Sequence, residues 1–228
     1  MKLILTCEHA GNTIPEKFKS VFDPFYAELN SHKGLDIGAL DLFNFLKPLA
    51  AYNRHETTSR LLIELNRSLH HKDLFSPVSK KLPSDEKQKL IASIYKPYRE
   101  TVEKVISDSI LSGEKVLHLS IHTFTPVWHG KERPCDMGIL YDSKQKTERA
   151  LAESFKSKLL EYSHFRIRFN YPYKGSSDGF TTYLRKKFPK NYWGIELEVN
   201  QKFATNHLMH KRVKEFIYKT VQSLTSTL

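Results

Sequence analysis

Three stretches of the chain place residues that can bind a metal or transfer a proton at the end of an apolar run. His122 follows KVLHLSI, and Glu8 and His9 follow KLILTC. Glu196 and Glu198 lie in YWGIELEVN. If these runs are β-strands, the side chains at their carboxyl ends meet at the edge of a sheet where ligands bind. The pattern therefore predicts one site built from residues that are far apart in the sequence.

These residue types point to metal-assisted hydrolysis. A catalytic zinc takes three protein ligands from His, Asp and Glu and leaves one position for water, whose pKa it lowers. The chain offers the strand-end histidines His9 and His122, the acid Asp36 near a predicted helix start, and Glu198. A carboxylate outside the ligand set can move the proton from water to the leaving group. With 11 histidines in the chain, spacing alone leaves open that each histidine is a hydrogen-bonded structural group.

Two helices are expected near these residues. Segment 35–51 has apolar residues at helical spacing, at Ile37, Leu40, Phe43 and Leu46. Asp36 lies near its start, where a carboxylate suits the helix dipole. Segment 83–112 is expected to begin with Ser84 as N-cap and to bend at Pro97.

Strands and helices alternate along the rest of the chain. Further strands are expected over 2–7, 114–122, 165–170 and 192–200, and further helices over 144–163, 178–188 and 206–224. Segment 59–68 alternates like a strand but is too short to assign. With no repeat and no Gly/Ser linker, this order predicts a single α/β domain over residues 1–228. We expect a three-layer α/β/α sandwich with a mixed, mostly parallel sheet.

Composition restricts the setting and the partners. There is no apolar run of 18 residues, so no membrane span is expected, and the apolar part of MKLILTCEHAGN is too short for a signal peptide. Two cysteines, Cys7 and Cys135, do not make a disulfide framework, which favours a reducing, cytoplasmic setting. The net charge of +11 is spread along the chain, so it fits attraction of a small acidic substrate as well as nucleic acid.

Five segments resemble, in order, those of the N-formylglutamate amidohydrolase family. They are CEHAGNTIP, LDIGA, TSRLLIELNRS, SIHTFTPVWHGKERPCDMGILYD and WGIELEVNQ, and the resemblance extends from residue 5 to about residue 205. It implies a fold shared with zinc carboxypeptidases and zinc-dependent cell-wall amidases. It also implies that His9, Asp36 and His122 bind one zinc ion and that Glu198 is the general base and acid.

Some assignments stay open at this stage. Glu8 could replace Asp36 as the third ligand, although adjacent strand residues point to opposite faces. Glu196 shares a face with Glu198 and could be the catalytic acid or a residue that orients the site. His118 lies on the same face as His122 but deeper in the strand, where we expect a buried, hydrogen-bonded histidine.

The candidate substrate-binding residues are Arg60, Asn66, Arg67, Thr182 and Asn200. Arginine binds carboxylates through two hydrogen bonds and stays charged, as recognition of an acidic N-acyl amino acid requires. The alternative is that one of the arginines pairs with Glu64 and organises the site. Segment 170–183, which contains Thr182, is expected to be a mobile loop that could cover the site.

The resulting hypothesis is a zinc-dependent amidohydrolase that cleaves a small N-acyl or N-formyl amino acid by attack of metal-activated hydroxide. Two rival functions follow from the same residues. A nucleic-acid-binding protein on a hydrolase-like fold would use the positive charge, and a peptidase or cell-wall amidase would need a long open cleft.

Overall fold

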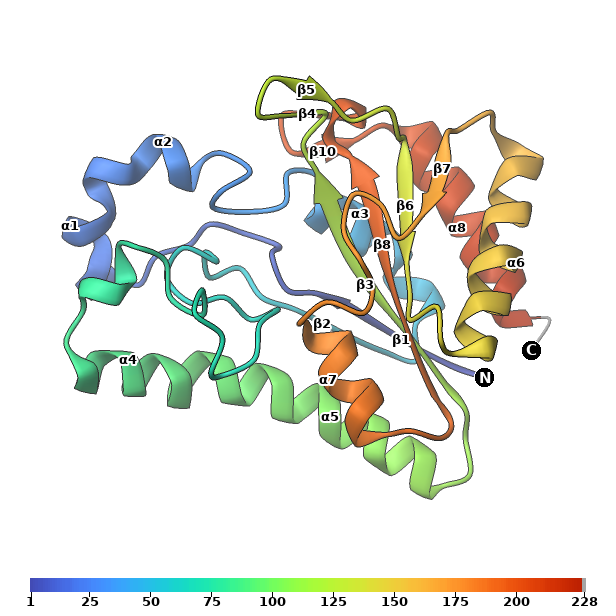
Figure 1. Ribbon diagram of the computed structural model, residues 1–228, viewed down its shortest axis with the longest axis horizontal. Helices are drawn as coiled ribbons and strands as arrows, with labels where there is room; N and C mark the ends of the chain where they lie inside the picture. Colours follow the sequence, from blue (N-terminus) through green and yellow to red (C-terminus); the bar gives the residue numbers. More distant parts are fainter. Residues whose placement is uncertain (227–228) are drawn as a thin grey trace.

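A six-stranded mixed sheet forms the centre of the molecule (Figure 1). The computed structural model describes residues 1–226. In spatial order the strands are β2 (Tyr52–His55), β1 (Lys2–Cys7), β3 (Val116–Phe124), β8 (Tyr192–Asn200), β6 (Met137–Leu140) and β7 (Ile167–Phe169). The first four are mutually parallel, whereas β6 runs antiparallel to β8, and β7 runs parallel to β6. The expected mixed, mostly parallel sheet is confirmed.

The two faces of the central strands β1, β3 and β8 differ in chemistry, because successive side chains of a strand point to opposite faces. One face is apolar and consists of Leu3, Leu5, Cys7, Leu117, Leu119, Ile121, Ile195, Leu197 and Val199. The other face carries polar side chains, namely Thr6, His118, Ser120, His122, Glu196 and Glu198. In the strand register Ser120 pairs with Glu196 and His122 with Glu198, so these side chains lie on the same face.

The apolar face is covered by α3 (Ala39–Leu46), α6 (Lys146–Tyr162) and α8 (Lys211–Ser226). Figure 1 shows α6 and α8 to the right of the sheet. The helix expected over 35–51 begins later than predicted, at Ala39, after Gly38 with a φ of 84°. A left-handed residue cannot continue a helix, so Asp36 lies in the loop before α3 and not in its first turn.

The polar face is covered by a second group of helices, which lies below and to the left of the sheet in Figure 1. It consists of α4 (Ser84–Leu90), a π-helical turn (Ile91–Tyr95), α5 (Lys96–Leu111) and α7 (Phe180–Lys187). Residues Tyr98, Val102, Ile106, Phe180 and Leu184 form its buried contacts with Ile4, Val116 and Tyr192 of the sheet. The molecule is therefore a three-layer α/β/α sandwich, as expected.

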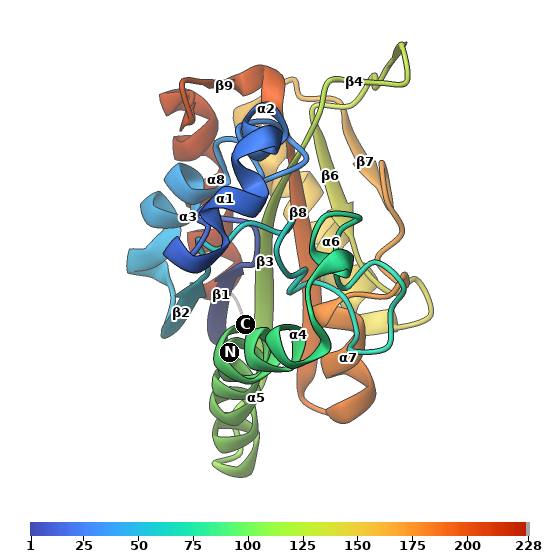
Figure 2. The same cartoon turned by 90° about the vertical axis from the view of Figure 1, so that its left-hand side faces the viewer.

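Short elements complete the fold. Near the N-terminus lie two 3-10 helices (Glu16–Phe18 and Asp23–Phe25), α1 (Lys19–Phe22) and α2 (Tyr26–Leu29). Other 3-10 helices span Lys47–Leu49, Ser79–Lys81 and Gln201–Phe203. The hairpins are β4 (Val127–Trp128) with β5 (Lys131–Glu132) and β9 (Ala204–Thr205) with β10 (Leu208–Met209). The β4–β5 hairpin projects at the top of the molecule in both views (Figures 1 and 2).

Several local predictions were wrong, each for a physical reason. Ser84 is the first residue of α4, because Pro83 occupies the N-cap position with an extended conformation. Where a bend is predicted, α4 and α5 are joined by the π-helical turn Ile91–Tyr95, just before Pro97, which lacks the N–H that a regular helical turn needs. The expected helix over 206–224 begins only at Lys211, after the β9–β10 hairpin.

Segment 59–68 is not a strand. Its apolar residues Leu62, Ile63 and Leu65 are buried, but the N–H groups of Leu62 and Ile63 bond to the carbonyl of Ser59 within the segment. The backbone therefore turns where a strand would pair with a neighbour. Within residues 1–226, no helix has the length and apolar character needed to cross a bilayer.

Candidate metal centre and active site

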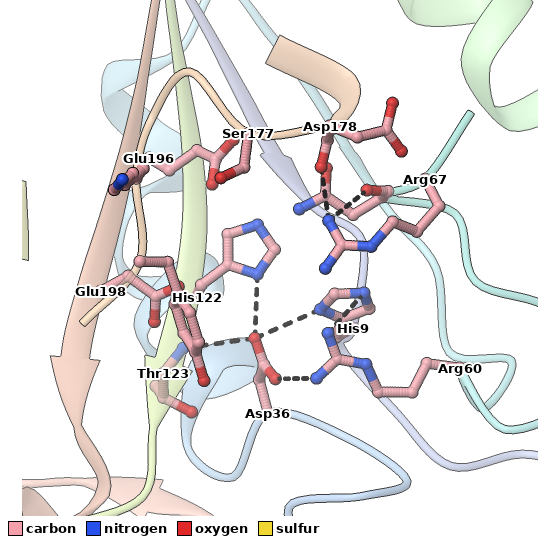
Figure 3. Close-up of a pocket in the computed structure, with 13 residues that line it drawn as sticks. His9, Asp36, Arg60, Arg67, His122, Thr123, Ser177, Asp178, Glu196 and Glu198 are labelled. Carbon is pink, nitrogen blue, oxygen red and sulfur yellow. Dashed lines mark hydrogen bonds and ion pairs between the residues drawn. The ribbon is translucent and has the colours of Figure 1, made fainter. Parts of the chain in front are cut away.

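Three buried side chains meet at the carboxyl ends of β1 and β3: His9, Asp36 and His122 (Figure 3). One ligand atom from each lies within 4.8 Å of the others. Asp36 Oδ2 is 2.9 Å from His122 Nδ1 and 3.4 Å from His9 Nδ1. The two imidazole rings have their centroids 5.0 Å apart. This set of two nitrogens and one oxygen has the composition of a divalent metal site.

The backbone holds the three residues together. His9 follows β1 by two residues, and its carbonyl accepts a 3.0 Å hydrogen bond from the N–H of Asp36. The Asp36 carboxylate also accepts a 3.3 Å hydrogen bond from the N–H of Thr123, next to His122 in β3. The loop before α3 is thus tied to both histidine-bearing segments, which fixes the position of its carboxylate.

A second carboxylate orients each imidazole. His9 Nε2 lies 2.5 Å from Glu64 Oε1. His122 Nε2 lies 2.9 Å from Ser120 Oγ, which donates to Glu8, and 3.2 Å from Glu8 Oε2 itself. Both Nε2 atoms therefore face acids, which leaves both Nδ1 atoms facing Asp36. Metal-binding histidines commonly have this arrangement, because the acid fixes the tautomer and the orientation of the ring. Within residues 1–226, His9 Nδ1 is buried without a hydrogen-bond partner, as expected of a ligand atom.

Glu8 lies behind His122 and outside the group of three. Its carboxylate accepts hydrogen bonds from Tyr98 Oη at 3.0 Å and from Ser120 Oγ at 2.5 Å. Burial alone would raise the pKa of Glu8, but hydrogen bonding and the positive charge of His122 outweigh burial and hold this pKa well below its usual range. Of the two acids considered as third ligand, the geometry therefore groups Asp36, and not Glu8, with the histidines.

Arg60 pairs with acids of the site. It donates from Nη1 to Asp36 Oδ1 at 3.0 Å and from Nε to Glu64 Oε2 at 3.1 Å. Burial opposes ionisation of Asp36, but Arg60 and the two histidines together hold the pKa of Asp36 well below its usual range. Arg60 Nη2 also lies 3.0 Å from His9 Nε2. His9 Nε2 cannot accept a hydrogen bond from Arg60 while it donates one to Glu64. A metal bound at Nδ1 would keep the proton on Nε2. Metal binding would therefore favour the hydrogen bond from Nε2 to Glu64.

Glu198 lies beside the group of three, directly opposite His122 in the register of β3 and β8. Its Oε2 atom is buried and has no hydrogen-bond partner among the residues that the structure describes. Burial raises the pKa of Glu198 to about 8, and the negative charges of Asp36 and Glu196 act in the same direction. A carboxyl group with a pKa near neutrality can both accept and donate a proton.

Gly138 of β6 faces Glu198 from the other neighbouring strand. A Cβ atom at Gly138 would lie 3.3 Å from the Cβ of Glu198 and 2.0 Å from the carbonyl oxygen of Tyr171. Only glycine allows the backbone of Tyr171 to approach this closely, so Gly138 keeps space beside the proposed base.

A cavity of about 200 Å³ opens onto these groups. Eight residues singled out in the sequence line it, namely His9, Asp36, Arg60, Asn66, Arg67, His122, Glu196 and Glu198. Five lining residues were missed: Thr123, Tyr173, Lys174, Ser177 and Asp178. Four of these belong to segment 170–183, which was recognised as a loop near the site, and Thr123 follows His122 directly. Their positions in or next to these recognised segments are the sequence feature that could have identified them as cavity residues.

Thr182 and Asn200 do not line this cavity. The Thr182 hydroxyl donates to the carbonyl of Gly175 at 3.3 Å. The amide of Asn200 is buried, where it donates to the carbonyl of Cys135 at 2.8 Å and accepts from the N–H of Lys202 at 3.0 Å. Both side chains make local contacts that stabilise the backbone around them.

Arg67 differs from Arg60 in its surroundings. In the described part of the chain Arg67 forms no ion pair, and its guanidinium donates to the backbone carbonyl of Asp178. Its own carbonyl accepts from Tyr95 Oη at 2.7 Å and from Arg99 Nη1 at 3.2 Å. The Arg67 guanidinium is therefore held at the cavity without an ion-pair partner among the described residues.

His118 is a buried structural group, as expected. It contacts Thr6 Oγ1 at 2.8 Å and Tyr192 Oη at 2.7 Å, and burial lowers its pKa to about 4. Cys7 and Cys135 are free and buried.

Comparison with known proteins identifies the family. The family model for N-formylglutamate amidohydrolase matches residues 1–204. None of the curated proteins matches the chain in sequence. The crystal structure of gene product Atu2144 from Agrobacterium tumefaciens superimposes with a TM-score of 0.83 at 24% identity, covering 99% of this chain and 91% of that one. The N-formylglutamate amidohydrolase from Ralstonia eutropha JMP134 superimposes with a TM-score of 0.74 at 14% identity, covering 100% and 95%.

The two structural matches show a shared fold, and the family model covers most of the sequence, including every residue that lines the cavity. The chain therefore belongs to the N-formylglutamate amidohydrolase family and is a hydrolase that acts on an amide C–N bond.

Proposed function

We propose that this protein is a zinc-dependent amidohydrolase that cleaves the amide bond of a small N-acyl or N-formyl amino acid. The observation that carries the proposal is the shared orientation of His9 and His122. Both present Nδ1 to one oxygen of Asp36, while both Nε2 atoms face acids, the partly buried Glu64 and the buried Glu8. A bound zinc ion would polarise the amide carbonyl and lower the pKa of a water molecule.

On this proposal His9, Asp36 and His122 hold the metal, and Glu64 and Glu8 fix the tautomers of the two histidines. Each imidazole then keeps its proton on Nε2 and offers the Nδ1 lone pair. The unpartnered Nδ1 of His9 supports this assignment. The negative charge of Asp36 would balance part of the charge of the cation.

Glu198 is proposed to move the proton. It would take a proton from the attacking water and give it to the nitrogen of the leaving amine, so that the C–N bond breaks to release an amino acid and a carboxylic acid. Its buried, unpartnered Oε2 and its raised pKa support this role. Glu196 is less suited, because its Oε1 already accepts the Thr181 hydroxyl at 2.5 Å.

Charged and polar residues at the cavity are proposed to bind the substrate. Arg67, without an ion-pair partner among the described residues, would bind the free carboxylate of the amino acid through two hydrogen bonds. Asn66 uses its Oδ1 to accept the N–H of Phe180, which leaves its NH₂ group to donate to a substrate oxygen. Arg60 would stabilise the negative charge that develops on the carbonyl oxygen.

The size of the cavity supports a small substrate over a peptide or a cell-wall fragment. We also propose that the protein acts in the cytoplasm, and the two free, buried cysteines support a reducing compartment.

The test is metal analysis of the purified protein followed by an activity screen on N-acyl amino acids. Glu198→Gln should keep one zinc per chain and lose turnover by about 10²- to 10⁴-fold, because the general base and acid is removed. Glu153→Gln, on the exposed side of α6, is the matched control and should behave as wild type. Wild-type turnover in Glu198→Gln would contradict the mechanism. Binding to nucleic acid with a steep salt dependence, together with absence of metal, would favour the rival function.

A further inference from the structure

Glu196 is a cavity acid that neither forms an ion pair in residues 1–226 nor has a role in the proposed proton transfer. Glu196 lies on β8, on the same face as Glu198, and lines the cavity. Its Oε1 accepts the hydroxyl of Thr181 at 2.5 Å, which fixes the carboxylate, whereas its Oε2 has no hydrogen-bond partner in residues 1–226. Glu196 also forms no ion pair within that range, so a negative charge is presented to whatever fills the cavity.

The other acids on the cavity wall are engaged. Asp36 pairs with Arg60 at 3.0 Å, and Asp178 accepts the N–H of Ser68 at 3.0 Å beside Arg67. Glu198 is assigned to proton transfer in the proposed function. Glu196 is therefore the acid left to contact the part of a substrate that does not react.

The loop opposite Glu196 is shaped to leave it accessible. A Cβ atom at Gly179 would lie 3.5 Å from Glu196 Oε1 and 3.2 Å from Asn66 Oδ1. A larger residue at this position would fill the space between the loop and the carboxylate. Glycine keeps that part of the cavity open.

Position along the strand indicates which part of a substrate reaches Glu196. Residues two apart in a strand are separated by about 7 Å, so Glu196 lies about 7 Å deeper on the sheet than Glu198. In the proposed function the substrate amide lies beside Glu198 and Arg67 binds the substrate carboxylate. The side chain of the substrate then extends along the sheet. That side chain would end against the carboxylate of Glu196.

We propose that Glu196 determines specificity, and that the substrate is an N-acyl amino acid whose side chain ends in an ammonium or guanidinium group. This rests on the proposed function and departs from the glutamate-like side chain that the family resemblance implies. A carboxylate in the substrate would face Glu196 at short range in a partly desolvated cavity, where two like charges repel. A cation there would form a charge-assisted hydrogen bond to Oε2.

The experiment measures kcat/KM for three substrates of similar length, N-formyl-L-ornithine, N-formyl-L-glutamine and N-formyl-L-glutamate. The wild type should prefer the cationic ornithine derivative over the neutral glutamine derivative by about 10- to 100-fold, the value of a hydrogen bond to a charged group. The glutamate derivative should be the poorest of the three. Glu196→Gln should abolish the preference for ornithine and retain turnover of the glutamine derivative.

Asp178→Asn provides the matched control, since it neutralises another acid of the same cavity whose oxygen is already engaged. Its ornithine-to-glutamine ratio should equal that of the wild type. Loss of the preference in Asp178→Asn but not in Glu196→Gln would overturn the assignment, as would a wild type that prefers the glutamate derivative. Either of those results would leave the proposed amidohydrolase function intact. If the zinc-loaded enzyme turned over none of the three derivatives, both the proposed function and the role of Glu196 would be overturned.

Discussion

Acid should destabilise this fold through His118, which lies on the polar face of β3, four residues before the candidate metal ligand His122. Burial lowers the pKa of His118 from 6.5 to about 4 in the folded protein. As the pH falls below 6.5, the unfolded chain binds a proton at this residue that the folded chain does not bind. The free energy of unfolding therefore loses nothing through His118 above pH 6.5. Below pH 6.5 it falls progressively as the pH approaches 4.

The magnitude follows from the two pKa values. Each unit of pKa difference corresponds to about 1.4 kcal/mol, so the full loss, reached only below pH 4, is about 3 kcal/mol. Between pH 7 and pH 5 the expected loss is about 2 kcal/mol, because pH 5 lies about 1.5 units below the pKa of the unfolded chain. A change of this size is a large fraction of the stability of a typical domain.

The assay is urea unfolding of the wild type and of His118→Gln at pH 7 and pH 5, with a chelator present so that metal binding does not contribute. His122 has a raised pKa, so its contribution has the opposite sign, present at low pH and lost as the pH rises. Since His122 is common to both proteins, it cancels in their difference. The stability advantage of the wild type over His118→Gln should shrink by about 2 kcal/mol from pH 7 to pH 5.

Equal pH dependence in the two proteins would refute this reasoning, because it would mean that His118 takes up a proton without unfolding. A direct check is the imidazole nitrogen chemical shifts of His118 by NMR. They should stay those of a neutral ring down to pH 5.

Other predictions concern the candidate metal centre and the cavity. His122→Ala should lose bound zinc, measured as metal per chain, while circular dichroism shows a retained fold; full zinc occupancy would reassign the ligand. Glu8→Gln should weaken zinc binding by about 10- to 100-fold in a chelator competition, because it removes the acid that orients His122; exposed Glu114→Gln is the control, and equal affinities would exclude Glu8 from this role. Arg67→Lys should raise KM more than it lowers kcat, since lysine cannot form the paired hydrogen bonds to a carboxylate; an unchanged KM would remove Arg67 from substrate binding.

The parts of the site that lie on strands could be predicted from sequence, because strand geometry is regular. Alternation along β3 and β8 predicts that His118 and His122 share one face and that Glu196 and Glu198 share one. The parallel pairing then places His122 opposite Glu198, although the two are far apart in sequence. The type of fold followed from the same alternation of apolar strands and amphipathic helices.

Loop conformations could not be predicted in the same way. Segment 59–68 has the apolar residues of a strand, yet its backbone turns so that Arg60 and Glu64 reach His9 and Asp36. Such a turn depends on contacts with residues distant in sequence, which periodicity does not report. Thr182 shows the same limit, since its position in a recognised loop gave no indication that its hydroxyl bonds to Gly175. The strands β2 and β6 have only four residues each, too few for a periodic signal.

The order of strands in the sheet has a consequence for how the enzyme is made. β8 lies between β3 and β6, both of which precede it in the sequence, so a nascent chain on the ribosome has to insert its last central strand between two that already exist. The proposed ligands His9, Asp36 and His122 emerge well before Glu198. An incomplete chain can therefore contain all three proposed zinc ligands before Glu198, the proposed general base, has been synthesised. During synthesis, zinc binding should therefore precede the onset of turnover.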